Sequence, residues 1–282
     1  MQSNTNKIIE YYNSCECDYR IFWDLDRSMA MHAGFWDSKT KTLKDALMRE
    51  NELLAEISDI KLQDKVLDAG CGIGGSSIFL AKKLGCEVVG ITLSEKQVDK
   101  ARKNAKAHGV DSLVRFEVMN FCHTTFPDAS FDVVWGIESV CHAEDKLSFV
   151  REAFRLLKKG GRLIMADGFS LKAVYTKAEA DEMRYWLNGW GVDRLDSREQ
   201  FYNHFASCGF ENVLCHDMTA SVMPSSKRLY KISLPAIACS KFGEWLGWRS
   251  SIQTHNLWAA YYQYLTLKKE LWEYAIFCAY KK

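Results

Sequence analysis

The chain has 282 residues, 48% of them hydrophobic, and its 37 Lys and Arg nearly balance its 36 Asp and Glu. A chain of this length can bury a sizeable core, and its charge balance excludes a protein that binds nucleic acid or a membrane by charge alone. We therefore expect a small-molecule partner, no nucleic acid and no stable membrane insertion. The sequence leaves the oligomeric state open, with a homodimer as one option.

The cysteines and the N-terminus indicate the cellular compartment. Ten cysteines are scattered without a regular framework, and MQSNTNKIIE has no apolar signal-peptide core. These features favour reduced thiols and a cytoplasmic protein. No run reaches the roughly 18 apolar residues that a membrane-spanning helix needs.

Strand-like and helix-like segments alternate through the middle of the chain. The expected strands are residues 65–70, 87–93, 113–119, 131–137 and 161–168, and the expected helices are 75–85, 94–109 with Ser94 as N-cap, and 145–161 closed by glycines. Strands and helices at this spacing form parallel pairs with right-handed crossovers. The pattern predicts an α/β fold with a doubly wound, mostly parallel sheet and a site at the carboxyl ends of its strands.

Three segments follow from changes in this pattern. Residues 1–60, which include NKIIEYYNS, are expected to form helices that cover one wall of the cleft. Residues 61–170 form the core. Residues 171–282 combine a helical lid, including the aromatic stretch 242–270, with two strands near 211–218 and 271–282 that bring the sheet to seven strands.

The strongest single motif is VLDAGCGIGGSS, residues 66–77. Glycines between a strand and a helix let the backbone approach a ligand and leave N–H groups free. Gly70, Gly72 and Gly75 also fit G-x-G-x-x-G, so an NAD-dependent oxidoreductase stays an alternative. Against it, the second strand ends in ITL rather than in the acid that binds a ribose. A turn needed only for tight packing is the third interpretation.

The ordered motifs VLDAGCGIGG, VVGITLSEKQV, FDVVWGIESVCHAED and LLKKGGRLIMAD resemble the class I S-adenosylmethionine-dependent methyltransferases. GITLSEKQ and IESVCHAED are similar to the small-molecule branch that includes sterol and tocopherol methyltransferases. The resemblance covers residues 30–170 and implies an enzyme with a Rossmann-like sheet and S-adenosyl-L-methionine as cofactor. The cofactor-binding residues that it implies are Asp68, Gly70, Gly72, Gly74, Thr92, Leu93, Gln97, Asn120 and Phe121. It also implies that HAGFWD, residues 32–37, closes over cofactor and substrate, with core packing as the alternative for Phe35 and Trp36. Tyr19 is a weaker candidate of the same kind.

GIESVCHAED follows the fourth expected strand, which places it beside the transferable methyl in a fold of this type. Methylation of a hydroxyl, or of an alkene that then loses a proton, needs a positioned base. His142 is the first candidate, because related enzymes carry a histidine at the matching position and its usual pKa is near 6.5. Glu138 is the second, and Asp167 is a candidate to orient the histidine. Each also has a structural alternative, as a residue that holds or caps neighbouring backbone.

Two further expectations concern metals and the acceptor. Cys141 and His142 are adjacent, so their side chains diverge, and without a C-x-x-C pair no metal site is expected. The aromatic residues of the lid predict a bulky, mostly apolar acceptor such as an isoprenoid, sterol, polyketide or aromatic natural product. These aromatic residues are Tyr185, Trp186, Trp190, Trp245, Trp248, Trp258, Tyr261 and Tyr262. The alternatives are ordinary core packing, an aromatic cage for N-methylation of a small amine, and a non-catalytic cofactor-binding protein.

Overall fold

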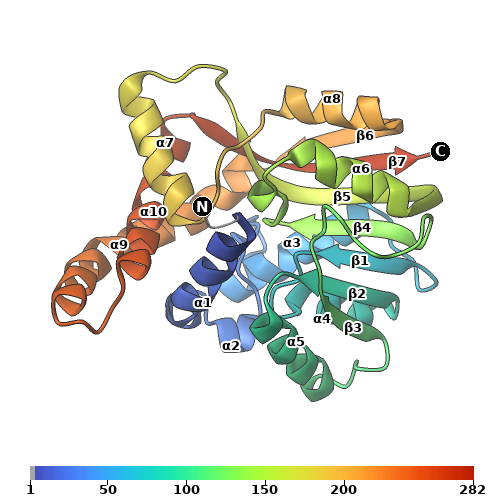
Figure 1. Cartoon of the computed structure of the whole chain (residues 1–282), viewed down its shortest axis with the longest axis horizontal. Helices are drawn as coiled ribbons and strands as arrows, with labels where there is room; N and C mark the ends of the chain where they lie inside the picture. Colours follow the sequence, from blue (N-terminus) through green and yellow to red (C-terminus); the bar gives the residue numbers. More distant parts are fainter. Residues whose placement is uncertain (1–3) are drawn as a thin grey trace.

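The computed structural model describes residues 4–282, which form a seven-stranded sheet with helices on both faces (Figure 1). The strands are β1 (Lys65–Ala69), β2 (Glu87–Thr92), β3 (Val114–Val118), β4 (Phe131–Ile137), β5 (Leu157–Ser170), β6 (Phe210–Asp217) and β7 (Trp272–Lys281). Their order in the sheet is β3-β2-β1-β4-β5-β7-β6. Neighbours among β1 to β5 are parallel, and β7 is antiparallel to β5 and β6. The predicted fold class is confirmed.

Helices cover the sheet and build a separate layer at its carboxyl edge. They are α1 (Asn4–Phe22), α2 (Leu25–Ser28), α3 (Leu43–Ile57), α4 (Gly75–Leu84), α5 (Glu95–Ala107), α6 (Lys146–Leu156), α7 (Lys177–Gly189), α8 (Arg198–Cys208), α9 (Thr219–Trp245) and α10 (Ser251–Lys268), with a short 3-10 helix η1 (Val140–His142). Helices α3, α4 and α5 pack on one face of the sheet, and α6 and α8 on the other. Helix α10 packs against both α7 and α9, and α1 lies against α10.

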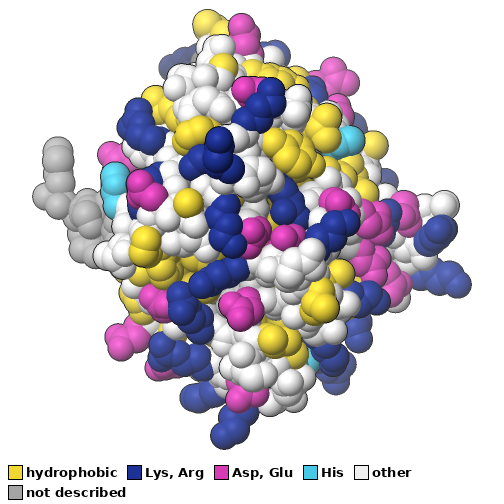
Figure 2. All heavy atoms as spheres, turned by 90° about the vertical axis from the view of Figure 1, so that its right-hand side faces the viewer, with side chains coloured by type: hydrophobic (Ala, Val, Ile, Leu, Met, Phe, Trp, Pro, Cys, Tyr) yellow, Lys and Arg dark blue, Asp and Glu magenta, His cyan; other side chains and the backbone are white. Residues whose placement is uncertain are grey.

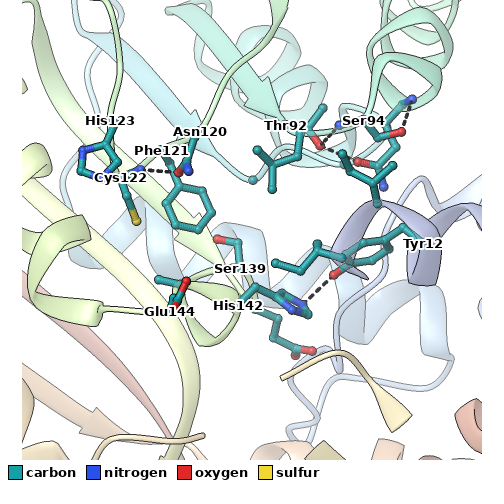
Figure 3. A pocket seen from close by; sticks show the side chains of 18 of the residues that line it. Tyr12, Thr92, Ser94, Asn120, Phe121, Cys122, His123, Ser139, His142 and Glu144 are labelled. Carbon is teal, nitrogen blue, oxygen red and sulfur yellow. Dashed lines mark hydrogen bonds between the residues drawn. The ribbon is translucent and has the colours of Figure 1, made fainter. Parts of the chain in front are cut away.

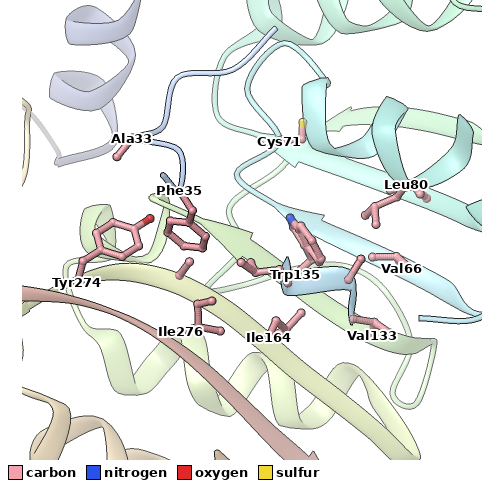
Figure 4. Packing of buried hydrophobic residues seen from close by; sticks show 14 of the residues in the cluster. Ala33, Phe35, Val66, Cys71, Leu80, Val133, Trp135, Ile164, Tyr274 and Ile276 are labelled. Carbon is pink, nitrogen blue, oxygen red and sulfur yellow. The ribbon is translucent and has the colours of Figure 1, made fainter. Parts of the chain in front are cut away.

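The core follows from strand alternation, which sends successive side chains to opposite faces. Trp135 of β4 is fully buried on the face covered by α3 and α4, beside Val66 and Ile164 (Figure 4). Its neighbour Val134 points to the α6 face and packs in the cluster that contains Phe149. Burying each such side chain contributes roughly 1.5–3 kcal/mol, so the alternation fixes the register of β4.

Most boundaries in the core agree with the prediction, with one correction. Residues 131–137 form β4 as predicted, and the Ser94 side chain accepts a hydrogen bond from the Gln97 N–H as the N-cap of α5. The helix expected over 145–161 ends at Leu156, because Leu157 already pairs with Phe131 at the start of β5. The glycines expected to close this helix belong to an irregular start of β5.

The C-terminal region needs one correction. The aromatic stretch 242–270 is mostly helical as predicted, and it contains the turn between α9 and α10, where Gly247 has φ +74°. Helix α8, expected in the lid, packs against β6 and α6 instead. The two added strands are confirmed as β6 and β7, with β7 inserted between β5 and β6.

The face at the amino ends of the parallel strands carries mixed charge. Figure 2 shows Lys and Arg side chains interspersed with Asp and Glu over this face. Within residues 4–282, no helix has both the length and the apolar character needed to span a bilayer. The features that follow lie at the opposite, carboxyl edge of the sheet.

Candidate active site

A cavity of about 350 Å³ opens at the carboxyl edge of the sheet, where β1 and β4 are neighbours and the chain leaves them in opposite directions (Figure 3). In an open α/β sheet this switch point is the place where ligands bind. The cavity walls are the loops after β1, β2, β3 and β4, and α1 covers it with Ile8, Ile9 and Tyr12. The volume falls in the usual range for a small-ligand pocket, roughly 300–1,000 Å³.

The glycine loop forms one side of this cavity and has no room for side chains. Gly70, Gly72 and Gly74 have φ of +95°, +52° and +89°, a region that L side chains rarely adopt. A Cβ on Gly70 would lie 2.3 Å from the Cβ of Ser139, and one on Gly74 would lie 2.8 Å from the Phe116 ring. Gly70 and Gly72 line the cavity, whereas Gly74 is the N-cap of α4.

Asp68 supports this loop through a hydrogen bond and does not line the cavity. Its Oδ2 accepts a hydrogen bond of 2.6 Å from the Ser77 hydroxyl, which ties β1 to the first turn of α4. Burial raises the pKa of the Asp68 carboxyl to about 6. Among the described residues, Asp68 is not part of the cavity wall, so its expected role reduces to holding the loop.

The remaining expected cofactor residues do line the cavity: Thr92, Leu93, Gln97, Asn120 and Phe121. The Thr92 hydroxyl bonds Gln97 Oε1 at 2.6 Å, and Asn120 Oδ1 accepts from the Cys122 N–H at 2.9 Å, which leaves the Asn120 amide N–H₂ for a ligand. None of the described residues in the wall is Lys or Arg, whereas three are acids, Glu138, Glu144 and Asp145. Such a wall suits a positively charged nucleoside and not a pyrophosphate.

A second cavity of about 60 Å³ adjoins the first on the side of the lid. Four residues, Tyr12, Met31, Glu138 and His142, line both cavities and form what we call the junction. The other lining residues of the second cavity come from α1, α7, β5, α10, β7 and neighbouring loops, and six of them are aromatic: Tyr19, Trp23, Trp186, Trp190, Trp272 and Tyr274. The two cavities are therefore arranged for two ligands that meet at the junction.

His142 stands at the junction with both ring nitrogens hydrogen-bonded. Nδ1 lies 3.2 Å from the Gly191 carbonyl, which can only accept, so Nδ1 carries the proton and Nε2 accepts from the Tyr12 hydroxyl at 2.8 Å. Figure 3 shows this pair beside the cavity. Burial lowers the pKa of His142 to about 4, against the expected value near 6.5. The imidazole is therefore neutral at physiological pH, the form that can accept a proton.

Glu138 lies at the junction at the end of a buried polar chain. Its backbone has φ +46°, and its Oε1 accepts from the Ala33 N–H at 2.7 Å. The Tyr274 hydroxyl lies 3.0 Å from Glu138 Oε1 and 2.9 Å from Glu50 Oε1, and Glu50 Oε2 lies 2.6 Å from His32 Nδ1. Burial, followed by repulsion from Glu50, raises the pKa of Glu138 to about 8. The single hydroxyl proton of Tyr274 can be donated to only one of the two carboxylates, Glu138 or Glu50. This geometry therefore also favours a protonated Glu138.

Asp167 does not orient His142. Its Oδ2 accepts from the Cys141 N–H and its Oδ1 from the Gly168 N–H, both at 2.8 Å, so it holds the backbone of the β4 loop. Burial raises the pKa of this carboxyl to about 6. The orienting contacts expected of Asp167 come instead from Gly191 and Tyr12. Asp167 still lines the second cavity.

The HAGFWD segment contacts the site through its backbone. Phe35 is buried in the core against Tyr274, and the Trp36 indole donates to the Ser225 hydroxyl at 2.7 Å. Neither ring lines a cavity: Phe35 takes the core role that was the alternative, and Trp36 is half-buried against α9. In residues 4–282 no three His, Cys, Asp or Glu side chains are grouped to hold a metal ion.

Most of the aromatic residues predicted for the acceptor pocket lie elsewhere. Only Trp186 and Trp190 line the second cavity, whereas the side chains of Trp245 and Trp248 are 78% and 77% exposed. Tyr12 of α1, Trp23 just after α1, and Trp272 and Tyr274 of β7 were not predicted for this pocket and do line it, together with Tyr19, which was a weaker candidate to close over cofactor and substrate. The spacing of Tyr12, Tyr19 and Trp23, seven and then four positions, matches one helix face and was the available signal.

Comparison with known proteins identifies the family of this chain. Residues 67–165 match the family model described as methyltransferase domain. The chain is 37% identical over 195 residues to 27-O-demethylrifamycin SV methyltransferase of Amycolatopsis mediterranei, covering 69% of this chain and 71% of the relative. It is 31% identical over 241 residues to the chloroplastic tocopherol O-methyltransferase of Arabidopsis thaliana, covering 77% and 66%.

A solved structure shows the same fold. Geranyl diphosphate C-methyltransferase from Streptomyces coelicolor A3(2), in complex with Mg²⁺, geranyl diphosphate and S-adenosyl-L-homocysteine, superposes with a TM-score of 0.77 at 20% identity, over 100% of this chain and 98% of that one. The chain therefore belongs to the S-adenosylmethionine-dependent methyltransferases that act on small molecules. This membership removes the oxidoreductase alternative. The cavity agrees with that conclusion, because none of its described lining residues is a Lys or Arg that would bind the pyrophosphate of NAD.

The glycine loop provides a test that needs no acceptor. Gly72→Val is expected to weaken S-adenosylmethionine binding at least tenfold, because a β-branched side chain at φ +52° distorts the loop and points toward Met31 Cε. Gly109→Val is the matched control, with φ +68° and open space around it, away from the cavity. Calorimetric titration of both folded variants measures the difference. Equal affinities would contradict a binding role for Gly72.

Proposed function

We propose that this enzyme transfers a methyl group to an oxygen or carbon of a compact, largely apolar acceptor, with His142 as general base. The observation that carries the proposal is the junction, where the two cavities meet at an acid-base pair, His142 and Glu138. The residues of the first cavity would hold S-adenosylmethionine, whose sulfonium supplies an already activated methyl. The protein then has to orient the acceptor, exclude water and take up a proton.

The hydrogen bonds of His142 define how it would take up that proton. An acceptor hydroxyl that replaces the Tyr12 hydroxyl at Nε2 meets a neutral imidazole with a free lone pair. The Gly191 carbonyl keeps Nδ1 protonated and stabilises the imidazolium that forms. The walls of α1 and the lid keep this transfer away from water.

The second cavity favours an acceptor that is apolar with a polar end. Its aromatic walls offer apolar area, and two buried polar atoms on its lining residues, Trp186 Nε1 and Gln263 Oε1, have no hydrogen-bond partner. An unpaired donor and acceptor favour a ligand with a hydroxyl or carbonyl oxygen there. A cavity of about 150 Å³ holds benzene, so a ring entering this space of about 60 Å³ requires α1 to move.

N-methylation of a small amine is the second candidate. Tyr12, Tyr19 and Trp23 with the tryptophans of the lid could surround a cationic amine. Glu138 and Asp167 lie in the same wall, but Glu138, with a pKa of about 8, is mostly neutral near pH 7, and both oxygens of Asp167 already accept backbone N–H groups. An oxygen or carbon acceptor therefore fits better.

The test is turnover with matched acceptors. We expect S-adenosylhomocysteine release and a methylated product with ring alcohols or phenols. Loss of turnover with their methyl ethers would identify oxygen as the acceptor atom, and ring methylation of the ethers would identify carbon. Gln263→Leu has a similar size and removes the unpaired oxygen, so it is expected to raise KM for the acceptor about tenfold with kcat changed less than twofold. Product from cyclic amines alone would favour the second candidate and refute the first.

A further inference from the structure

The hairpin of α9 and α10 projects beyond the rest of the molecule and ends in exposed aromatic side chains (Figure 1). Trp245 and Trp248 keep about three quarters of their surface exposed, and Phe242, next to Trp245, is 59% exposed. Tryptophan is usually well buried in a folded chain, so two exposed ones at one turn need an explanation. The cavities do not provide it, because neither tryptophan lines them.

The turn that carries these side chains is held in place by the body of the protein. Arg249 donates to both carboxylate oxygens of Asp18 on α1, at 2.8 and 2.9 Å, and to the Ser240 hydroxyl at 2.7 Å. The Trp248 N–H bonds the Gly243 carbonyl at 2.8 Å. The aromatic side chains are therefore presented on a fixed turn.

A single exposed stripe runs along α9 toward this turn. Its positions recur every three or four residues and so share one helix face. They are Lys227, Lys231, Leu234, Ala238, Phe242 and Trp245, all exposed. The stripe is basic at its start and apolar at its end, and it contains no acid.

The basic part of the stripe borders a shallow groove of about 440 Å³. The groove is lined by Lys227, Arg228 and Lys231 with Pro224 and Ile232, and none of these described lining residues is an acid. Among them, Arg228 is partly engaged, because it donates to the Phe22 carbonyl at 2.8 Å. The two lysines leave a positive surface at the start of the same helix face that ends in the aromatic side chains.

We propose that the outer face of α9 and the turn after it form a peripheral docking surface for a lipid bilayer with anionic headgroups. Tryptophan rings partition to the boundary between headgroups and acyl chains, and neighbouring lysines attract anionic lipids. The stripe combines positive charge with apolar rings, and an anionic bilayer offers a complement to both, headgroups for the lysines and an apolar boundary for the tryptophans. The binding is reversible and independent of the acceptor.

The test measures binding of the full chain to vesicles by co-sedimentation. We expect binding to vesicles of phosphatidylcholine with phosphatidylglycerol and at least tenfold weaker binding to phosphatidylcholine alone. The double variant Trp245→Ala/Trp248→Ala should bind the anionic vesicles at least tenfold more weakly. Lys227→Gln/Lys231→Gln should lower the vesicle affinity about fivefold per lysine. The matched controls are Leu62→Ala/Val174→Ala, exposed apolar residues elsewhere, and Lys82→Gln/Lys83→Gln on α4.

Three outcomes would overturn the docking surface. The first is no binding to either kind of vesicle by a protein that still binds S-adenosylmethionine. The second is an equal loss in the matched controls, which would indicate nonspecific adsorption. The third is concentration-dependent dimerisation in analytical ultracentrifugation that the tryptophan variant abolishes, because the stripe would then be an interface between two copies. Cofactor binding and turnover in the absence of vesicles should be unchanged in all four variants.

Discussion

Replacing His142 with alanine is expected to lower kcat by about 10² to 10⁴, the usual contribution of a positioned general base. The neutral imidazole at the junction is the group whose free lone pair can take the acceptor's proton, and alanine removes it. Affinity for S-adenosylmethionine should change less than threefold, because His142 forms only one part of the wall of the cofactor cavity. Single-turnover methylation and calorimetric titration of the same variant measure the two effects.

Tyr12→Phe separates catalysis from support. If His142 served only to pin α1 through the Tyr12 hydroxyl, removing that hydroxyl would cost as much turnover as removing the histidine. As a base, His142 should keep most of its effect in Tyr12→Phe, and added imidazole should restore part of the activity of His142→Ala. Equal losses in the two variants, or no rescue by imidazole, would falsify the assignment.

The pH profile adds an independent signature. The base acts while it is neutral, so at saturating S-adenosylmethionine the wild-type kcat/KM for the acceptor should hold as pH falls to the pKa of His142, about 4, and drop below it. A histidine with its ordinary pKa would show this drop near 6.5. An acid limb near 6.5 would contradict the dry environment that lowers the pKa.

The fold was predictable because its signals are local. Each of the strands β1 to β4 is a short apolar run bounded by turn residues, and the N-cap Ser94 lies next to the helix that it begins. The end of α6 was mispredicted for a different reason. Pairing of Leu157 with Phe131, a contact between strands, ended the helix before its glycines.

The site was predictable only where it follows strand ends. The β1 and β4 loops brought Gly70, Gly72, Glu138 and His142 together as expected. The partners that set their chemistry come from distant segments: Tyr12 lies 130 residues from His142, and Tyr274 lies 136 residues from Glu138. No spacing in the sequence reports such contacts. The prediction therefore assigned to Asp167 the orienting role that Gly191 and Tyr12 fill in the structure.

Glu138 leads to the second large effect, a pH-dependent affinity for the cofactor. Its carboxyl has a pKa of about 8 and lines both cavities, so below pH 8 it is mostly neutral in the free protein. A sulfonium bound beside it favours the carboxylate, so binding below pH 8 must release a proton. Affinity for S-adenosylmethionine should rise up to tenfold per pH unit from pH 6 to 8 and then level off.

Calorimetry at pH 6, 7, 8 and 9 measures this slope on wild type and Glu138→Gln. The glutamine cannot titrate, so its affinity should be nearly independent of pH. S-adenosylhomocysteine, whose sulfur is uncharged, should show little slope with either protein. Glu144→Gln is the matched control, because Glu144 is an exposed acid in the wall of the same cavity. A slope that persists in Glu138→Gln would assign the titration to another group.

The raised pKa of Glu138 should also make the stability of the free protein depend on pH. A folded-state pKa of about 8 lies above the unfolded value near 4.3, so the folded form holds its proton more tightly, and stability falls as pH rises between these values. The loss is at most about 1.4 kcal/mol per pH unit and ends near pH 8. Glu138→Gln escapes it, so the variant should melt above wild type at pH 8 and close to it at pH 5. Equal melting differences at both pH values would show that Glu138 is already ionised in the folded protein, which would also remove the basis for its pH-linked cofactor binding.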